Sequence, residues 1–389
     1  MSRKLNRCYN IARLRERASK RLPAPMFHYI DGAAGDEWTM NRNTQAFDAY
    51  ELVPRYLVDV SKIDLSTSVF GQPIDWPVFC SPTAMNRLFH HEGECAVARA
   101  AADEGTMYSL SSISTASIEE VAEVFEGPKL FQIYVFKDRG IDREFIRRCK
   151  DAGYAALALT VDVPTAGNRE RDLDTGMTVP PRLTLMSLLD IAMHPRWVWN
   201  HLTKRPIELA NVRDRVSNDL TTLSQFFSDQ LDRSVTWDDA ASMIDEWGGP
   251  FAIKGILSAA DAKRAAEIGA SAVIISNHGG RQLDTAPAPI EVLKEVVDAV
   301  GDRCEVILEG GVRRGVHVMK ALALGAKACS VGRPYLFGLA AGGEAGAKKA
   351  LNILRTDLER DMTLVGCRNV NEIDSRVIRD VPVWPVSRR

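Results

Sequence analysis

The chain has 389 residues, 46% of them hydrophobic and 26% charged, with a formal net charge of −2 at pH 7. This length suits two ordinary domains or one large α/β barrel, and the near-neutral charge excludes a bulk attraction to nucleic acid. The seven cysteines are scattered and form no CxxC pair. They argue against a zinc site or a disulfide framework and predict a reducing, cytoplasmic setting.

Residues 1–75 form an N-terminal extension that precedes the first predicted barrel strand. Its start, "MSRKLNRCYNIARLRERASKRL", is basic and fits either a transit peptide or an amphipathic helix with Ile11 and Leu14 on one face. We favour the helix, since the stretch lacks the apolar core of a secretory signal. The later stretch "YIDGAAGDEWT" (29–39) predicts a helix end and a turn that folds over one mouth of the domain.

From residue 76 onward, apolar runs of strand length alternate with helical patterns, which indicates repeated βα units and a parallel sheet. There are eight such runs, at 78–81, 106–110, 130–133, 155–161, 251–254, 272–276, 305–308 and 328–331. Helices are predicted at 236–247, 289–300 and 315–325, the second with Ile290, Leu293, Val297 and Val300 on its apolar face. A doubly wound open sheet shows the same alternation, but eight strands close a (β/α)8 TIM barrel. We therefore predict one α/β domain over residues 1–389.

An insertion over residues 165–235 follows the fourth strand and greatly exceeds an ordinary βα loop. Within it, 183–202 ("LTLMSLLDIAMHPRWVWNHL") is mostly apolar but is interrupted by charged residues and by Pro195. It is too broken to span a bilayer. Two interpretations stay open: a lid packed on the barrel, or a segment lying in a membrane interface, where tryptophans and basic residues are favoured.

Polar residues follow all eight predicted strands, and the carboxyl ends of barrel strands meet at one mouth. In chain order they are Thr83, Ser111, Gln132, Tyr134, Thr160, Asp162, Lys254, His278, Arg281, Glu309, Arg313 and Arg333. Eight polar exits exceed what a purely structural barrel needs, so the sequence predicts a binding or catalytic site there. The loops after the last two strands, with Gly310, Gly311 and Gly332, fit a phosphate held by backbone N–H groups.

Four of these residues have the chemistry of catalysis or substrate binding. His278 is the candidate general base, with Asp162 orienting its other ring nitrogen, and Arg281 suits bidentate capture of a carboxylate. Lys254 has three interpretations: a cation that stabilises charge on a bound ring, a Schiff-base amine, or a lysine merely paired with Asp162. The other histidines, among them His90, His91 and His317, read as surface or helix residues without metal-ligand spacing, so we expect no metal.

The stretches "SNHGGRQLD", "SPTAM", "FQIYV", "LALTVD", "IKGI" and "GGVRRG" together resemble the FMN-dependent L-2-hydroxyacid dehydrogenases and oxidases over nearly the whole chain. The resemblance implies FMN as cofactor and oxidation of a 2-hydroxyacid to the 2-oxoacid. It implies His278 as base, Asp162 as its stabiliser, and Arg281, Arg169, Tyr29 and Tyr134 around the substrate. Lys254 would face the N1/O2 edge of the flavin.

The resemblance also implies a set of cofactor contacts. They are Thr83, Ala84, Ser111, Gln132, Thr160, Lys254, Glu309, Gly310, Gly311, Arg313, Gly332 and Arg333. Gly279 and Gly280 are expected to keep their loop bare where substrate and flavin approach. Two departures matter: Glu309 stands where many relatives have Asp, which puts its hydrogen bond to the ribityl chain in question, and Ile113 stands where plant glycolate oxidases have tryptophan.

The insertion motifs "RERDLDTGM" and "HPRWVW" resemble the bacterial membrane-associated lactate and mandelate dehydrogenases, whereas "SPTAM" resembles the oxidases. We therefore expect oxidation of L-lactate to pyruvate with a quinone or cytochrome as acceptor, in a cytoplasmic protein peripheral to the inner membrane. The alternatives are an (S)-mandelate dehydrogenase, an oxygen-using glycolate or lactate oxidase, or a catalytically silent flavin-binding protein. Relatives form tetramers, so a homotetramer is implied.

Overall fold

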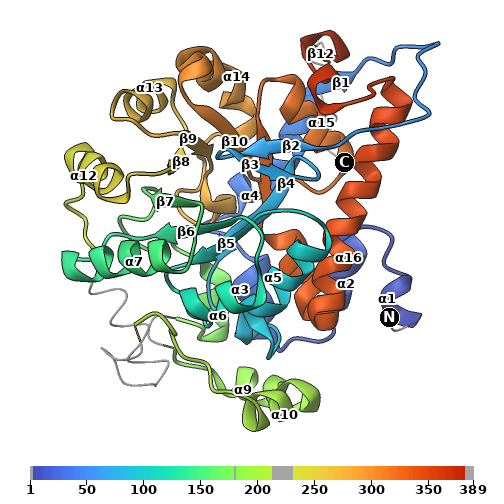
Figure 1. The fold of residues 1–389 in the computed structure, drawn as a ribbon. Helices are drawn as coiled ribbons and strands as arrows, with labels where there is room; N and C mark the ends of the chain where they lie inside the picture. Colours follow the sequence, from blue (N-terminus) through green and yellow to red (C-terminus); the bar gives the residue numbers. More distant parts are fainter. Residues whose placement is uncertain (1–2, 179–180, 213–230, 382–389) are drawn as a thin grey trace.

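The computed structural model describes residues 3–178, 181–212 and 231–381. Eight parallel strands close into a barrel in the order β10-β11-β4-β5-β6-β7-β8-β9 (Figure 1). Their bounds are β4 Val78–Thr83, β5 Tyr108–Ser111, β6 Lys129–Ile133, β7 Ala156–Thr160, β8 Phe251–Ile256, β9 Ala272–Ile275, β10 Glu305–Glu309 and β11 Ala328–Val331. The predicted barrel and all eight predicted strands are confirmed.

The barrel interior follows the two-residue period of its strands. Ala156 and Ala158 of β7 belong to a buried cluster inside the barrel, while Leu157 and Leu159 pack into the larger core beneath the helices. A short hairpin closes the amino-terminal end, because Val69 of β2 (Thr67–Val69) and Ile74 of β3 (Gln72–Ile74) join the interior cluster. Continuing the same parity toward the carboxyl end of each strand replaces apolar residues by Ser81, Ser111, Gln132, Thr160, Lys254, Ser276, Glu309 and Ser330.

Helices between the strands cover the outside of the barrel (Figure 1). They are α5 Gly93–Asp103, α6 Ile118–Val124, α7 Arg139–Asp151, α12 Trp237–Trp247, α13 Ala259–Glu267, α14 Pro289–Val300, α15 Gly315–Ala323 and α16 Arg333–Val365. The three predicted helices are confirmed. On α14, Ile290, Leu293 and Val300 are buried as predicted. Val296 is buried in place of the predicted Val297, which is only partly buried.

The N-terminal extension forms α1 Arg3–Asn6, α2 Ile11–Ser19, α3 Ala24–Asp31 and α4 Trp38–Gln45. Helix α2 buries Ile11 and Leu14 and lies along α16, as the predicted amphipathic helix requires. The turn after α3 reaches the carboxyl mouth of the barrel, since Ala34 N–H donates to the Gly280 carbonyl over 2.9 Å. Strand β1 (Tyr50–Leu52) then pairs antiparallel with β12 (Ile378–Asp380), which ties the extension to the carboxyl-terminal part of the chain.

The insertion contains α8 Glu170–Thr175, α9 Leu185–Ala192 and α10 Pro195–Thr203. Pro195 begins α10, a position where its missing N–H costs nothing, so the apolar stretch 183–202 becomes two short helices. These two helices lie apart from the barrel (Figure 1) and expose Leu185, Met186, Leu189, Met193, Trp199 and Leu202. Among the described residues, none of the helices combines the length and apolar character that a membrane crossing requires.

Candidate active site

A cavity of about 300 Å³ opens at the carboxyl end of the barrel. Fourteen of the predicted site residues line it: Tyr29, Thr83, Ala84, Tyr134, Arg169, Lys254, His278, Arg281, Glu309, Gly310, Gly311, Arg313, Gly332 and Arg333. Four predicted site residues do not line the cavity but lie at or just after the carboxyl ends of β5, β6 and β7: Ser111, Gln132, Thr160 and Asp162. The sequence therefore identified which residues the fold brings to one place.

His278 is held by two contacts at the start of the 3₁₀ turn η4 (His278–Gly280). Its Nδ1 lies 3.0 Å from Oδ1 of Asp162, and its backbone N–H donates to the Ser276 hydroxyl over 3.0 Å. Its φ of 58° is left-handed, which is costly for a non-glycine residue and persists where the surroundings impose it. Burial opposes ionisation of Asp162, but the positive charges of His278 and Lys254 outweigh it and lower the pKa of this carboxyl. An anionic Asp162 stabilises a protonated imidazole.

Lys254 is paired with Glu309, which corrects the interpretation that paired it with Asp162. The Nζ atom forms a hydrogen-bonded ion pair with Glu309 Oε1 and lies 3.2 Å from the Ser276 hydroxyl. Glu309 also accepts hydrogen bonds from Ser276 over 2.8 Å and from Ser330 over 2.9 Å. Burial raises the pKa of Glu309, but the Lys254 charge and these hydrogen bonds lower it further than burial raises it. Glu309, which stands where many relatives have Asp, is therefore fixed by Lys254, Ser276 and Ser330.

Two guanidinium groups lie over one phenol ring in the cavity. The Cζ atoms of Arg281 and Arg169 are 4.8 Å and 5.5 Å from the ring centroid of Tyr29. Arg281 also donates to the Tyr29 carbonyl. Burial, followed by the like charge of Arg169, lowers the pKa of Arg281, so an anion between the two groups would relieve their repulsion. Buried Tyr134 stands nearby with a raised pKa, caused by burial and then by Asp162, and keeps its proton as a donor.

The two glycine-arginine loops have the composition of an anion cradle. Burial, followed by the charges of Arg281 and Arg313, lowers the pKa of Arg333 to about 9, and burial lowers that of Arg313 to about 10. Arg333 already donates to three backbone carbonyls, those of Ile30, Gly279 and Gly32, at 2.8–2.9 Å. A Cβ added at Gly332 would meet Thr83 Cγ2 only at 3.4 Å, so this glycine leaves room on the cavity side.

The strand ends next to the cavity carry hydrogen-bonding groups that suit a flavin. Gln132 Nε2 and Thr160 Oγ1 are buried and, within the described residues, have no hydrogen-bond partner. The Gln132 side chain is fixed by the Ser111 hydroxyl, which donates to its Oε1 over 2.7 Å. Buried polar groups in native proteins are almost always satisfied, so unmet groups here indicate a polar ligand. Together with the cradle beside Gly332, these residues fit FMN.

Gly279 and Gly280 have a steric reason in addition to the one expected. Both have positive φ, 67° and 77°. A Cβ at Gly280 would lie 2.6 Å from the Met40 backbone nitrogen of α4, and one at Gly279 would lie 2.7 Å from Arg333 Nη1. The left-handed turn against α4 and Arg333 is a backbone reason for both glycines. Gly279 also lines the active-site cavity, and the expectation that the loop is bare for substrate and flavin stays a prediction.

Sequence reasoning missed residues that support the site from inside the barrel. Ser276 contacts Lys254, Glu309 and the His278 backbone, and Ser330 connects Glu309 to Ser81 over 2.8 Å. The available signal was the strand parity, which places these serines on the same inward face as Lys254. The insertion also contributes apolar lining: Met177 ends the quoted motif "RERDLDTGM", whereas no motif indicated Ile207, Leu209 and Leu231.

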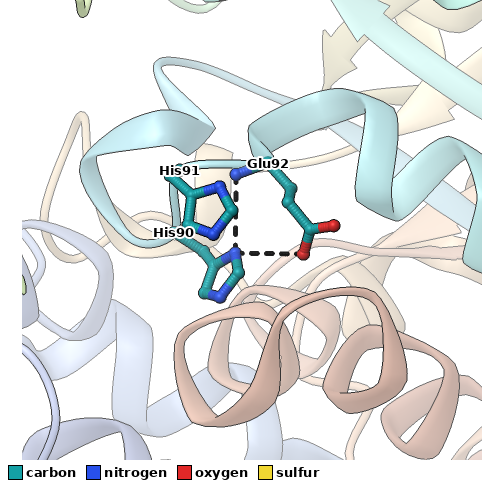
Figure 2. A group of neighbouring side chains, drawn as sticks. All are labelled: His90, His91 and Glu92. Atoms are coloured by element: carbon teal, nitrogen blue, oxygen red, sulfur yellow. Dashed lines mark hydrogen bonds and ion pairs between the residues drawn. The ribbon is translucent and has the colours of Figure 1, made fainter. Parts of the chain in front are cut away.

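Of the histidines set aside in the sequence, His317 lies in a helix, as one of the two interpretations had it. His317 is buried in α15, stacks on Phe47 with centroids 4.4 Å apart, and has its pKa lowered to about 4, chiefly by burial. His90, His91 and Glu92 lie together before α5, and one ligand atom of each falls within 4.8 Å of the others (Figure 2). The fold brings these three ligand atoms together although their sequence spacing matched no ligand motif, and the expectation of no metal stays a prediction.

The fold and the site together define a class of protein: barrel oxidoreductases that hold a phosphorylated flavin beside a small organic anion. The profile of the "FMN-dependent dehydrogenase" family matches residues 18–380, and the chain belongs to this family. It is an FMN-dependent 2-hydroxyacid oxidoreductase.

Relatives span both oxidases and dehydrogenases. Spinach (Spinacia oleracea) glycolate oxidase is 43% identical over 356 residues, which cover 92% of this chain and 91% of the relative. L-lactate oxidase of Nostoc sp. is 43% identical over 370 residues, covering 94% and 96%. The solved structure of the monotopic membrane protein (S)-mandelate dehydrogenase superposes with a TM-score of 0.91 at 36% identity, covering 96% of this chain and 99% of that one.

Proposed function

We propose that the chain oxidises L-lactate to pyruvate and passes the electrons to a quinone or cytochrome at a membrane. The observation that carries the proposal is that His278, held by Asp162 at 3.0 Å, lines the same cavity as Arg281 and Arg169. A base and two guanidinium groups in one small cavity match a substrate with an alcohol hydroxyl and a carboxylate on neighbouring carbons.

The roles proposed for the substrate side follow from these positions. Because Nδ1 of His278 is bound to Asp162, Nε2 is the nitrogen that takes the substrate hydroxyl proton, and Asp162 stabilises the resulting imidazolium. Arg281 and Arg169 hold the carboxylate, and the phenols of Tyr29 and Tyr134 donate to it. Bound FMN supplies the two-electron acceptor.

The roles proposed for the cofactor side use the remaining residues. Arg313, Arg333 and the backbone of Gly310, Gly311 and Gly332 hold the phosphate. Thr83, Ala84, Ser111, Gln132 and Thr160 contact the flavin. Lys254 stabilises negative charge on the flavin ring, and its ion pair with Glu309 moderates the positive charge of Lys254.

A second substrate, (S)-mandelate, is favoured by the similarity to (S)-mandelate dehydrogenase, whereas the similarity to the Nostoc oxidase favours lactate. The cavity wall is apolar around the substrate position, with Met85, Phe89 and Ile113. Anaerobic bleaching of the flavin by L-lactate, glycolate and (S)-mandelate separates these substrates. The fastest bleaching by L-lactate is expected. Faster bleaching by mandelate would reassign the substrate, and a flavin that stays yellow with all three would leave only a silent flavin-binding protein.

The acceptor proposal rests on α9 and α10, whose exposed apolar side chains suit a membrane interface. Reoxidation of the reduced flavin by a quinone analogue is expected to outpace reoxidation by oxygen. The opposite order would make the protein an oxidase. Deleting residues 183–202 is expected to release the protein from membranes while dye-linked activity persists, and unchanged partitioning would leave only the lid interpretation. A homotetramer is proposed by family resemblance, and light scattering measures it.

A further inference from the structure

A second cavity, of about 890 Å³, lies between α2, the segment before α5, and α10. It is distinct from the active-site cavity, although Phe89 and Ile207 line both. We call it the basic cavity because nine lysine and arginine residues line it against one acidic residue, Glu16. From this cavity we propose that the protein binds the phosphate headgroup of an anionic phospholipid, an inference that rests on the membrane contact proposed above.

Most of the positive charge in the basic cavity is uncompensated. Arg205 is paired with Glu120 and Glu208, and Arg13 with Glu16. Within the described residues, the other seven cations have no carboxylate within 4.0 Å; they are Lys4, Arg7, Arg17, Lys20, Arg21, Arg87 and Arg196. Like charges gathered this way destabilise the folded chain unless an anion joins them.

Individual arginine side chains also lack anionic or hydrogen-bonding partners. Arg87 keeps two buried nitrogens, Nε and Nη1, that have no hydrogen-bond partner among the described residues. Burial, followed by the charges of Arg17 and Arg196, lowers the pKa of Arg21. Arg21 and Arg196 come from the end of α2 and the start of α10, which are far apart in sequence. The fold therefore converges cations from separate elements on one space, which a phosphate oxyanion satisfies with charge-assisted hydrogen bonds.

The histidine group beside this cavity does not make it a cation site. The rings of His90 and His91, drawn in Figure 2, stack with centroids 4.5 Å apart. Both residues line the basic cavity together with its arginines. Burial, followed by the nearby His91 and Arg21, lowers the pKa of His90 to about 4. A divalent cation would meet the same positive field that disfavours the imidazolium. Neutral imidazoles can instead donate an N–H to an anion.

The position of the basic cavity selects a lipid among phosphate-bearing ligands. Met193, Pro195 and Trp197 line it and belong to the α9–α10 segment, whose apolar side chains Leu189, Met193 and Trp199 are exposed beside it. An anion bound here thus lies at the edge of an apolar surface. A phospholipid supplies both parts, a phosphodiester for the cavity and acyl chains for the exposed surface.

The test compares two double variants with equal charge change. Arg21→Ala with Arg196→Ala removes cations of the basic cavity, whereas Arg182→Ala with Lys204→Ala removes exposed cations of the same insertion that do not line it. Holoenzyme is sedimented with phosphatidylcholine vesicles with and without 30% phosphatidylglycerol. We expect stronger binding to the anionic vesicles, a loss of about thirtyfold in the cavity variant and at most about threefold in the control. Equal losses in the two variants would overturn the cavity as the headgroup site.

Two further arms separate the remaining explanations. Calorimetric titration with inorganic phosphate tests a free anion: tight, variant-sensitive phosphate binding together with unchanged vesicle binding would overturn the lipid assignment. A Met193→Ser, Trp199→Ser variant tests the apolar contact itself. If this variant loses vesicle binding and the cavity variant does not, the headgroup inference alone fails. If neither loses it, the proposed membrane contact fails, and flavin bleaching by hydroxyacids is unaffected by either outcome.

Discussion

Replacing Glu309 by glutamine tests whether Lys254 depends on its buried partner. The substitution keeps the size of the side chain and removes its charge, so that the Lys254 ammonium, 3% exposed, loses the carboxylate to which it is hydrogen-bonded. The glutamine also places an NH₂ group where one carboxylate oxygen stood. At the Oε1 position this group would face the Lys254 ammonium, which cannot accept, and at the Oε2 position it would turn the Ser330 hydroxyl into an acceptor.

Breaking a buried ion pair from one side costs about 3–5 kcal/mol, because the surviving charge keeps its desolvation penalty. We expect the free energy of unfolding of the FMN-free protein to fall by this amount in Glu309→Gln at pH 7, measured by urea denaturation. Glu305→Gln is the matched control at the other end of β10, where the carboxylate only accepts the Phe70 N–H over 2.8 Å. Its expected cost is about 1 kcal/mol.

The difference between wild type and Glu309→Gln also depends on pH. The folded-state pKa of Glu309 lies below the ordinary value of 4.5, so its contribution is fully present above pH 4.5 and is lost as pH falls through the folded pKa. The stability gap is expected to close in acid. A Glu309→Gln protein no less stable than Glu305→Gln at pH 7, or a gap that widens as pH falls, would refute the reasoning.

Three other substitutions give separate tests. His278→Ala is expected to retain FMN but slow anaerobic flavin reduction by about 10²–10⁴-fold in stopped flow; near-normal reduction would remove His278 as the base. Burial raises the pKa of Asp142 to about 7. The folded protein therefore keeps this proton at pH values where the unfolded chain, with the ordinary pKa of 3.8, has lost it. The free energy of unfolding then falls as pH rises from 3.8 to about 7. Asp142→Asn should therefore gain stability relative to wild type at pH 8 compared with pH 5, and a pH-independent difference would contradict this. Ile113→Trp narrows the cavity and should lower kcat/KM for (S)-mandelate at least about tenfold more than for glycolate, while equal losses would place Ile113 away from the substrate side chain.

Much of the fold was readable because the barrel repeats one pattern. Each strand is a short apolar run followed by polar residues, and that repetition identified all eight strands and most of the cavity lining. The partner of Lys254 was not predictable in the same way, since choosing between Asp162 and Glu309 requires the strand order and the inward parity of β8 and β10. The role of Gly280 was missed for a similar reason, because its neighbour Met40 is far away in sequence.

The insertion and the basic cavity lay further beyond sequence reasoning. The start of the chain reads as basic, but only the packing of α2 along α16 brings Arg17 and Arg21 to the same cavity as Arg196. His90 and Glu92 are two residues apart, a spacing that matches no common ligand motif. Only the structure shows that their ligand atoms lie close together.

The β2–β3 hairpin closes one end of the barrel. With Val69 and Ile74 filling the amino-terminal end, the cavity of the described residues opens at the carboxyl mouth, where hydroxyacid enters and oxoacid leaves. If the acceptor is the quinone proposed above, its bulk requires the oxoacid to leave first, and the two half-reactions then take turns. The small hairpin farthest from the chemistry thus favours a ping-pong order of turnover, in which an excess of one reactant slows the entry of the other.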